Sequence, residues 1–539
     1  MKKWKKYFSA SLLTVVSAAT LAACSNKSST SGTKQTLNWM TKSELQTLDL
    51  SKVTDATSLD QINNSMEGLY RLGKNSKVEN ALATKTEVSK DGKVWHFTLR
   101  KNAKWSNGDP VTALDYVTAW RRTVDPKNSS LDADSYAIIK NGEAISQGKA
   151  PVNSLGIKAL GKYKVQVTLA NPIPYLPQIL EGAQFYPQNS KLVKKLGSKY
   201  GTSSNNLVYN GPFTVSGWTG SNLKWTYKKN PTYWNKKIVD LNKVNVQVVQ
   251  TPSTGVNLFR SDELDYTTLT SDFVKQYQNN SSYHTKVTPT NGYLSFNLKR
   301  KSTGNVHIRR AISRAINKQQ LVKTVLHQGK VSNGIVAANF ITDQATGNDY
   351  RKDAGDLITY NAKEAKKEWQ LGLKQLGKKK LTLELLTSDI DDAKRVGEFI
   401  QSDLMKNLPG LTLRVRSIPL KSRLSNTTNH NYDFVYGTWQ PSYEDPIDFL
   451  TVGGLFNLAP DYHNANFWKQ IDLARSTYAT DPQKRLNALV NAEKQLIQKD
   501  AFAAPLFQQG TSYLLNKRVK GFQLSPYGNV AYYWNVKMK

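Results

Sequence analysis

Cys24 is the only cysteine in this 539-residue chain, so no disulfide can hold any part of its fold. The fold must therefore depend on hydrophobic cores, and the chain is long enough to form more than one domain. A disulfide framework is excluded, and so is a thiol nucleophile anywhere after Cys24.

The segment before Cys24 has the layout of a bacterial export signal. Four lysines among the first six residues precede an uncharged stretch at 7–23. The stretch ends in Leu21-Ala22-Ala23-Cys24, the pattern of a lipobox, in which the thiol receives a diacylglyceryl group as a thioether. This stretch is too short and too rich in Ser and Thr to favour a membrane span.

We therefore expect residues 1–23 to be a lipoprotein signal peptide that is cut before Cys24, the lipidation site. Residues 24–35 are rich in Ser, Thr, Lys and Gly and predict a flexible tether, with the fold beginning at Leu37. This layout predicts a cell-membrane location, lipid-anchored on the extracellular face of a Gram-positive-like cell.

The chain is strongly basic, with 74 Lys and Arg against 41 Asp and Glu and a formal charge of +33. An exported lipoprotein does not normally meet nucleic acid, and the lysines are scattered along the chain. We expect no nucleic-acid partner; an anionic cell-wall surface is the simpler one.

Hydrophobic periodicity predicts a mixed α/β fold. Apolar residues alternate with polar ones at 164–169, 244–248 and 381–385, which indicates strands. Residues 308–321 have helical spacing, with Arg309 and Lys318 expected on the surface. Asp481-Pro482 predicts the start of a helix that runs through Gln498.

No motif indicates an enzyme. Phosphate-binding glycine loops, HExxH pairs and GxSxG elbows are absent from the sequence. None of the six histidines is spaced as a metal ligand; they are His96, His284, His307, His327, His430 and His463. We expect no catalytic site, no metal and no cofactor.

One long motif is more specific: residues 104–122 read KWSNGDPVTALDYVTAWRR. Asn107-Gly108 predicts a turn with positive φ, and the residues after Pro110 predict a helix with Val117 and Trp120 in a core. Further motifs follow in order along the chain: Thr47-Leu48-Asp49, Met66-Glu67-Gly68-Leu69-Tyr70, Asn210-Gly211-Pro212-Phe213, Lys229 to Trp234, Arg309 to Ile316, Trp439 with Asp445-Pro446, Ala504-Pro505-Leu506 and Val519 to Phe522.

Together these motifs resemble the family-5 extracellular solute-binding proteins of ABC importers, the group that binds oligopeptides and dipeptides. The resemblance implies an α/β, periplasmic-binding-protein-like two-lobed clam with an additional domain (cluster C type), which closes on ligand at a hinge. It implies lobe one at 36–77, 208–290 and 505–539, the extra domain at 78–207, and lobe two at 291–504.

The resemblance also implies a ligand site. Peptide binders of the family hold an extended ligand against strands from both lobes by main-chain hydrogen bonds. The corresponding segments here are Ala56-Thr57-Ser58 in lobe one and Tyr436, Gly437, Thr438, Trp439 and Gln440 in lobe two.

The chain departs from the family pattern at Ser442. Peptide binders usually carry Asp at this place, and that Asp takes the α-ammonium group of the ligand. Ser442 therefore places recognition of a free N-terminus in doubt. Three alternatives stay open: Glu444 or Asp445 substitutes for the missing acid, the peptide is blocked or longer, or the ligand is not a peptide.

The function that the resemblance implies is peptide transport: a monomeric lipoprotein captures oligopeptides outside the cell and delivers them to ABC transporter permease subunits. Two alternatives remain. One is a receptor for a specific peptide signal or a non-peptide solute, such as a sugar or a metal chelate, and the other is a cationic surface adhesin.

Overall fold

The computed structural model describes residues 35–539 except 54, 74–76, 131, 344–345, 451–461 and 526–530. The expected signal peptide, Cys24 and all but the last residue of the expected tether lie outside the described residues. Among those that are described, no helix is both long and apolar enough to cross a bilayer.

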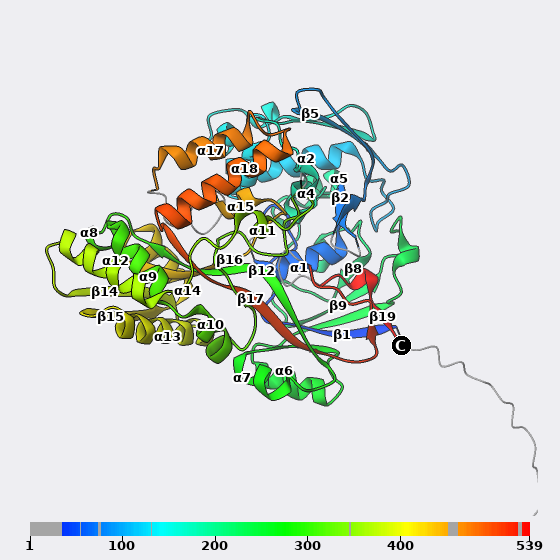
Figure 1. Ribbon diagram of the computed structural model, residues 1–539. Coiled ribbons are helices and arrows are strands. Elements are labelled where there is room, and N and C mark those ends of the chain that lie inside the picture. Colours follow the sequence, from blue (N-terminus) through cyan, green and yellow to red (C-terminus); the bar gives the residue numbers. More distant parts are fainter. Residues whose placement is uncertain are drawn as a thin grey trace, which may run out of the picture. The chain divides into compact units, whose positions relative to one another are not determined.

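The first sheet has four strands in the order β1-β10-β9-β8 (Figure 1). It comprises β1 (Thr36–Thr41), β10 (Lys243–Val248), β9 (Lys224–Lys229) and β8 (Phe213–Ser216). β1 pairs in parallel with β10, and the other pairs are antiparallel. The predicted start of the fold and the predicted strand at 244–248 are confirmed.

A second four-stranded sheet has the order β4-β5-β7-β6. Its strands are β4 (Ala83–Val88), β5 (Val94–Leu99), β7 (Lys164–Thr168) and β6 (Ile157–Ala159). The predicted alternation at 164–169 is confirmed, because Val165 and Val167 are fully buried while the residues between them are partly exposed.

The motif at 104–122 forms a turn followed by helix α2 (Ala113–Val124). Gly108 has a φ of 90°, as the turn requires. The Asp115 carboxylate accepts the Thr112 amide at 2.8 Å and so caps the start of the helix. Trp120 is fully buried, as predicted.

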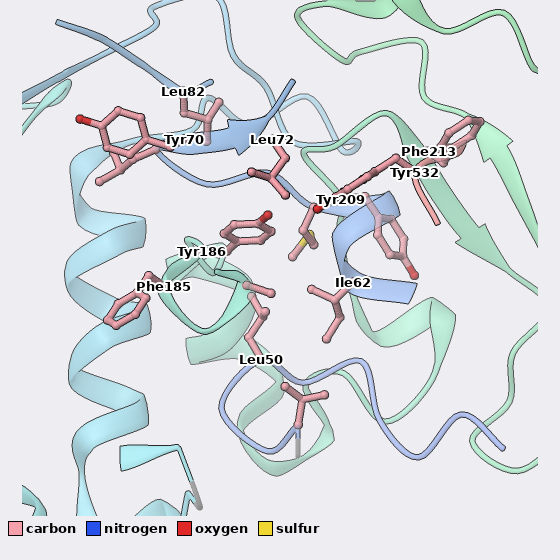
Figure 2. Close-up of a cluster of buried hydrophobic side chains, with 14 of the residues drawn as sticks. Leu50, Ile62, Tyr70, Leu72, Leu82, Phe185, Tyr186, Tyr209, Phe213 and Tyr532 are labelled. Atoms are coloured by element: carbon pink, nitrogen blue, oxygen red, sulfur yellow. The ribbon is translucent and has the colours of Figure 1, made fainter. Parts of the chain in front are cut away.

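One continuous hydrophobic core lies under both four-stranded sheets; we call it the first core. Figure 2 shows part of it, with Tyr186 among side chains that include Ile62 and Leu72. A Cβ at Gly68 would lie 2.4 Å from the Tyr186 ring, so a side chain at position 68 cannot be accommodated without movement. Residues of the expected extra domain thus share a core with those of expected lobe one.

The largest sheet has seven strands, in the order β11-β17-β12-β16-β14-β15, with β13 pairing to β17. Strand bounds are β11 (Tyr266–Leu269), β12 (Tyr283–Phe296), β13 (Lys330–Val331), β14 (Leu381–Ser388), β15 (Leu411–Ile418), β16 (Phe434–Trp439) and β17 (Ala503–Leu515). The predicted strand at 381–385 is confirmed as part of β14.

Helices pack on this sheet to form two further cores. Those of the second core include α15 (Pro446–Leu450), α17 (Ala465–Arg475) and α18 (Pro482–Glu493). Those of the third core include α9 (Val306–Ala315), α12 (Ala362–Gln375) and α13 (Asp391–Asn407). The remaining described helices are α1 (Ala56–Ser65), α3 (Gly142–Ser146), α4 (Leu176–Leu180), α5 (Ser190–Leu196), α6 (Pro252–Arg260), α7 (Ser271–Tyr277), α8 (Lys301–Gly304), α10 (Lys318–Leu321), α11 (Tyr350–Ala354) and α14 (Leu420–Thr428). Short strands β2 (Tyr70–Leu72), β3 (Val78–Asn80), β18 (Val519–Lys520) and β19 (Lys537–Met538) complete the fold.

The helix predicted at Asp481 begins as expected, because the Asp481 side chain accepts the Lys484 amide at 3.1 Å. From Lys494 to Lys499 it continues as a π-helix rather than an α-helix.

The predicted surface position of Arg309 and Lys318 is wrong. Arg309 is 6 % exposed and Lys318 is 1 % exposed. Both side chains satisfy carbonyl groups that would otherwise be buried without a donor: the Lys318 ammonium donates to Ser332 and Ile358, and Arg309 donates to Asp500 among others. Burial lowers the pKa of Lys318 to about 7.

Strand β17 joins the first core to the second and third, and β12 pairs with it. They pair antiparallel from Tyr283 to Ser295, with register shifts on either side of Asn291 and Gly292. At one end of β17, Leu515 lies in the first core; at the other, Ala503 and Ala504 lie in the second and third cores. Figure 1 shows the two strands side by side, β12 in green and β17 in red.

Candidate functional site

The edge of β16 is open over half of its length. β16 pairs with β12 from Phe434 to Trp439, but with β14 only at Phe434 and Val435. Among the described residues, no strand pairs with Tyr436–Trp439 on the β14 side. The main-chain groups along such an edge can pair with another extended chain.

The side chains at this edge alternate in exposure. Tyr436 and Gly437 are buried, Trp439 is half-buried, and Thr438 and Gln440 are exposed. The end of β16 is therefore accessible from one face, while its other face packs against the protein.

Residues 56–58 do not form the expected strand. They are the first turn of α1, where the Asp55 carboxylate accepts the Ser58 amide at 2.8 Å. Asp55 is a favoured helix N-cap, which explains why the chain coils here. Ser58 is fully buried, and its hydroxyl accepts the amides of Gln46 and Thr47, each at 3.3 Å.

Ser58 thereby holds residues 42–47, an irregular segment directly after β1. Lys42, Ser43, Glu44 and Gln46 are exposed, whereas Leu45 is buried. Sequence reasoning missed this segment, although a run of polar residues after a buried strand was a usable signal.

The carboxylate of Asp392 affects one residue of the segment after β1 and one residue of β16. Lys42 is exposed to water, yet the protein around its ammonium group lowers its pKa. The negative charge of Asp392 raises the pKa and so opposes part of this effect. Burial raises the pKa of Tyr436, and Asp392 raises it further. The Asp392 carboxylate thus influences both Lys42 of the segment after β1 and Tyr436 of β16.

A cavity of about 420 Å³ lies in this region. Met40 and Lys42 line it on one side, and Asp391 and Asp392, at the start of α13, line it on the other. Arg395 and Asp272 also line the cavity, and Arg395 donates two hydrogen bonds of 3.0 and 2.8 Å to the Asp272 carboxylate.

The turn at 439–446 is fixed by Asp448 of α15. Its Oδ2 atom accepts the Ser442 amide at 2.9 Å and the Trp439 indole N–H at 3.2 Å. Asp448 is fully buried, and this burial raises its pKa to about 7. The Ser442 side chain remains exposed.

The two acids that could replace the one missing at Ser442 are in different surroundings. Asp445 forms a buried bidentate pair with Arg485, at 2.8 and 2.9 Å, so it already has a cationic partner. Glu444 is half-buried, and burial raises its pKa.

Tyr443 of the same turn stacks on Tyr175, which precedes α4. The ring centroids are 5.7 Å apart. Cavities of about 290 and 310 Å³ border Tyr175, and the larger one also borders Tyr443. Within the described ranges, no group of three or more His, Cys, Asp or Glu could hold a metal ion.

Residues 77–454 match the model of the bacterial extracellular solute-binding proteins, family 5 Middle. The chain belongs to this family. The dipeptide-binding protein of Lactococcus lactis is 32 % identical to this family-5 protein over 545 residues, which cover 98 % of each chain.

Two solved structures are similar to this family-5 protein. Listeria monocytogenes OppA bound to peptide has 39 % identity and a TM-score of 0.80, covering 94 % of this chain and 99 % of its own. The pheromone receptor PrgZ has 32 % identity and a TM-score of 0.80, covering 94 % of this chain and 100 % of its own. The family resemblance and the α/β two-lobed binding-protein fold predicted from the sequence are confirmed.

Proposed function

We propose that this protein captures oligopeptides outside the cell and delivers them to the permease of an ABC importer. The open edge of β16 carries this proposal. An extended peptide can add to that edge through main-chain hydrogen bonds, which make affinity largely independent of sequence. The peptide-bound Listeria structure supports the same ligand class.

In this proposal the peptide backbone pairs with Gly437, Thr438, Trp439 and Gln440, beside Tyr436. Ser442 lies beyond the end of the strand, near one terminus of the peptide. The turn of Ala56, Thr57 and Ser58 does not pair with the peptide in this proposal. Instead, Ser58 holds residues 42–47 in place through hydrogen bonds, and these residues contact the peptide from lobe one.

Calorimetric titration with a synthetic library of tri- to hexapeptides tests the proposal. We expect binding of many sequences and loss of binding when backbone amides of a bound peptide are N-methylated, because the methyl group removes a strand donor. N-methylation at a residue outside the paired stretch is the matched control. If every methylated peptide binds as well as its parent, pairing with β16 is wrong.

We further infer a division into lobe one (36–77, 208–290 and 505–539), an extra domain (78–207) and lobe two (291–504). The path of β12 and β17 between the cores supports a hinge at the two lobe boundaries. In this arrangement the peptide lies between Lys42 and Tyr436 and is enclosed when the lobes close.

We also infer that Cys24 is lipidated and tethers a monomer to the outer face of the cell membrane. The lipobox supports this anchor, and the formal charge of the cut chain, 33 − 4 = +29 without the four lysines of residues 1–23, supports a further contact with the anionic cell wall. Cys24→Ala should leave an unprocessed precursor that takes up no labelled palmitate in growing cells. Labelling of the variant equal to that of the natural chain would refute the anchor.

A second candidate is a receptor for one particular peptide signal, and the likeness to the pheromone receptor PrgZ favours it. The same library distinguishes the two functions. A transporter binds many members with similar affinity, whereas a signal receptor retains one sequence far more tightly than the rest.

A further inference from the structure

We infer that Asp448 supplies the carboxylate that receives the α-ammonium group of a bound peptide, in place of the acid missing at Ser442. This inference rests on the proposed function and specifies its ligand: a peptide with a free N-terminus. It assigns the role to an acid six residues further along the chain, on α15 rather than in the turn.

The hydrogen bonds of Asp448 are incomplete. Oδ2 accepts from the Ser442 amide and the Trp439 indole. Oδ1 is buried and has no partner among the described residues. A buried carboxylate oxygen without a donor is unfavourable, and an arriving ammonium group would supply the donor.

Asp448 also lacks a positive partner, unlike other buried acids of this part of the fold. Asp445 is paired with Arg485, and Glu493 is paired with Arg351. No Lys, Arg or His in the described residues forms an ion pair with Asp448; the charge that acts on it is the negative one of Asp445. A buried acid without a cationic partner in the protein is suited to bind a cationic group of a ligand.

The position of Asp448 connects it to the proposed peptide path. It binds directly to the main chain of Ser442 and to the ring of Trp439, the last residue of β16. In the proposed binding mode, a peptide whose terminus extends past the end of β16 reaches the turn that Asp448 holds.

This arrangement also gives a physical reason for serine at position 442. An aspartate there would add a second carboxylate to the turn whose amide Asp448 binds, and carboxylates that share a site resist ionising together. Serine removes this conflict, and its hydroxyl oxygen can accept a second hydrogen bond from the same ammonium group.

The surroundings of Asp448 link ligand binding to pH. Burial raises its pKa to about 7, and the neighbouring charge of Asp445 adds to this effect. Arg485 of α18 pairs with Asp445, and Tyr443 and Glu444 are the other titratable groups of the turn. An ammonium group favours the ionised form of Asp448, so binding below pH 7 should release a proton.

Three variants test the inference: Asp448→Asn, Glu444→Gln and the double variant Ser442→Asp/Asp448→Asn. Asparagine keeps an oxygen that can accept from Ser442 and Trp439 but removes the charge. Glu444→Gln is the matched control, because it removes a half-buried acid from the same turn. The probes are free and N-acetylated members of the tri- to hexapeptide library that bind the natural chain.

We expect Asp448→Asn to weaken binding of free peptides by about tenfold or more and to leave acetylated peptides unaffected. The control should bind as the natural chain does, and the double variant should recover most of the loss. Equal binding of free peptides by Asp448→Asn and the natural chain would overturn the role of Asp448, while the proposed function would stand. A natural chain that binds no library member would overturn both.

A second measurement needs no variant and so does not depend on how Asp448→Asn folds. At pH 6, titrations in buffers of different ionisation enthalpy report the protons released on binding. Free peptides should release more protons than their acetylated forms. Equal release by the two forms would contradict the inference.

Discussion

Tyr175 stacks on Tyr443 with the two ring planes inclined by only 14°. The Arg485 guanidinium lies 4.7 Å from the centre of the Tyr175 ring while it binds Asp445. Tyr175 packs on the first core, and Arg485 belongs to α18 of the second core. The stack therefore connects the segment before α4 to the turn that follows β16.

Tyr175→Ala should weaken peptide binding about fivefold to tenfold, because a stacked aromatic pair contributes roughly 1 kcal/mol and joins parts of the protein that must approach on closure. Tyr175→Phe keeps the ring and should bind almost normally. Calorimetric titration of both variants with one peptide measures the difference. A similar loss of peptide affinity in Tyr175→Phe and Tyr175→Ala would assign the effect to the hydroxyl group instead of the ring.

Arg395→Ala should have a smaller effect than Tyr175→Ala, although Arg395 forms two good hydrogen bonds with Asp272. The side chains of Arg395 and Asp272 are 42 % and 74 % exposed, so water and salt screen their attraction. We expect less than about a threefold change in affinity at physiological salt. A tenfold loss would show that this pair controls closure.

Ligand should also draw the lobes together. Small-angle scattering should give a smaller radius of gyration with a saturating tight peptide than without one, because a hinged protein binds ligand better when closed. Tyr175→Ala should show a smaller change at saturation. An unchanged curve for the natural chain would argue against a hinge at β12 and β17.

The stability of the empty protein should report Asp448 through its pH dependence. A carboxyl whose pKa is about 7 when folded and near 4 when unfolded stabilises the fold below pH 4, and this contribution is lost as pH rises through 7. Asp448→Asn should therefore gain stability relative to the natural chain as pH rises from 5 to 8, by up to about 3 kcal/mol, because about two of the three pKa units lie in this range. Denaturant unfolding of Asp448→Asn and of the natural chain at pH 5 and at pH 8 measures this gain in the free energy of unfolding.

A constant difference between Asp448→Asn and the natural chain at pH 5 and pH 8 would contradict the raised pKa. Glu181 serves as a comparison away from the proposed site, since burial also raises its pKa to about 7. Glu181→Gln should show the same trend in stability without changing peptide affinity.

Local signals in the sequence predicted local structure well. Alternating valines gave β7 and β10, and Asp481 marked the start of α18. Periodicity could not reveal that Lys318 is buried, because the carbonyls that it satisfies come from residues 332 and 358. Long-range partners of this kind are not encoded in the spacing of apolar residues.

The site was predicted less completely than the fold. The family motif located β16 and Ser442, but the resemblance also implied a strand at residues 56–58, which Asp55 caps as a helix. The sequence does not indicate a role for Asp448, because an acid two residues after a proline forms no distinctive pattern. Its importance comes from an unpaired oxygen and from the position of Trp439, both of which require coordinates.

The pairing of β12 with β17 restricts how the protein can move. β17 runs between the cores, and β12 is hydrogen-bonded to it along most of its length. We therefore expect them to bend together as one two-stranded ribbon when the lobes move. A probe on either strand would then report the same opening event, and a mutation that stiffens one strand would slow capture and release together.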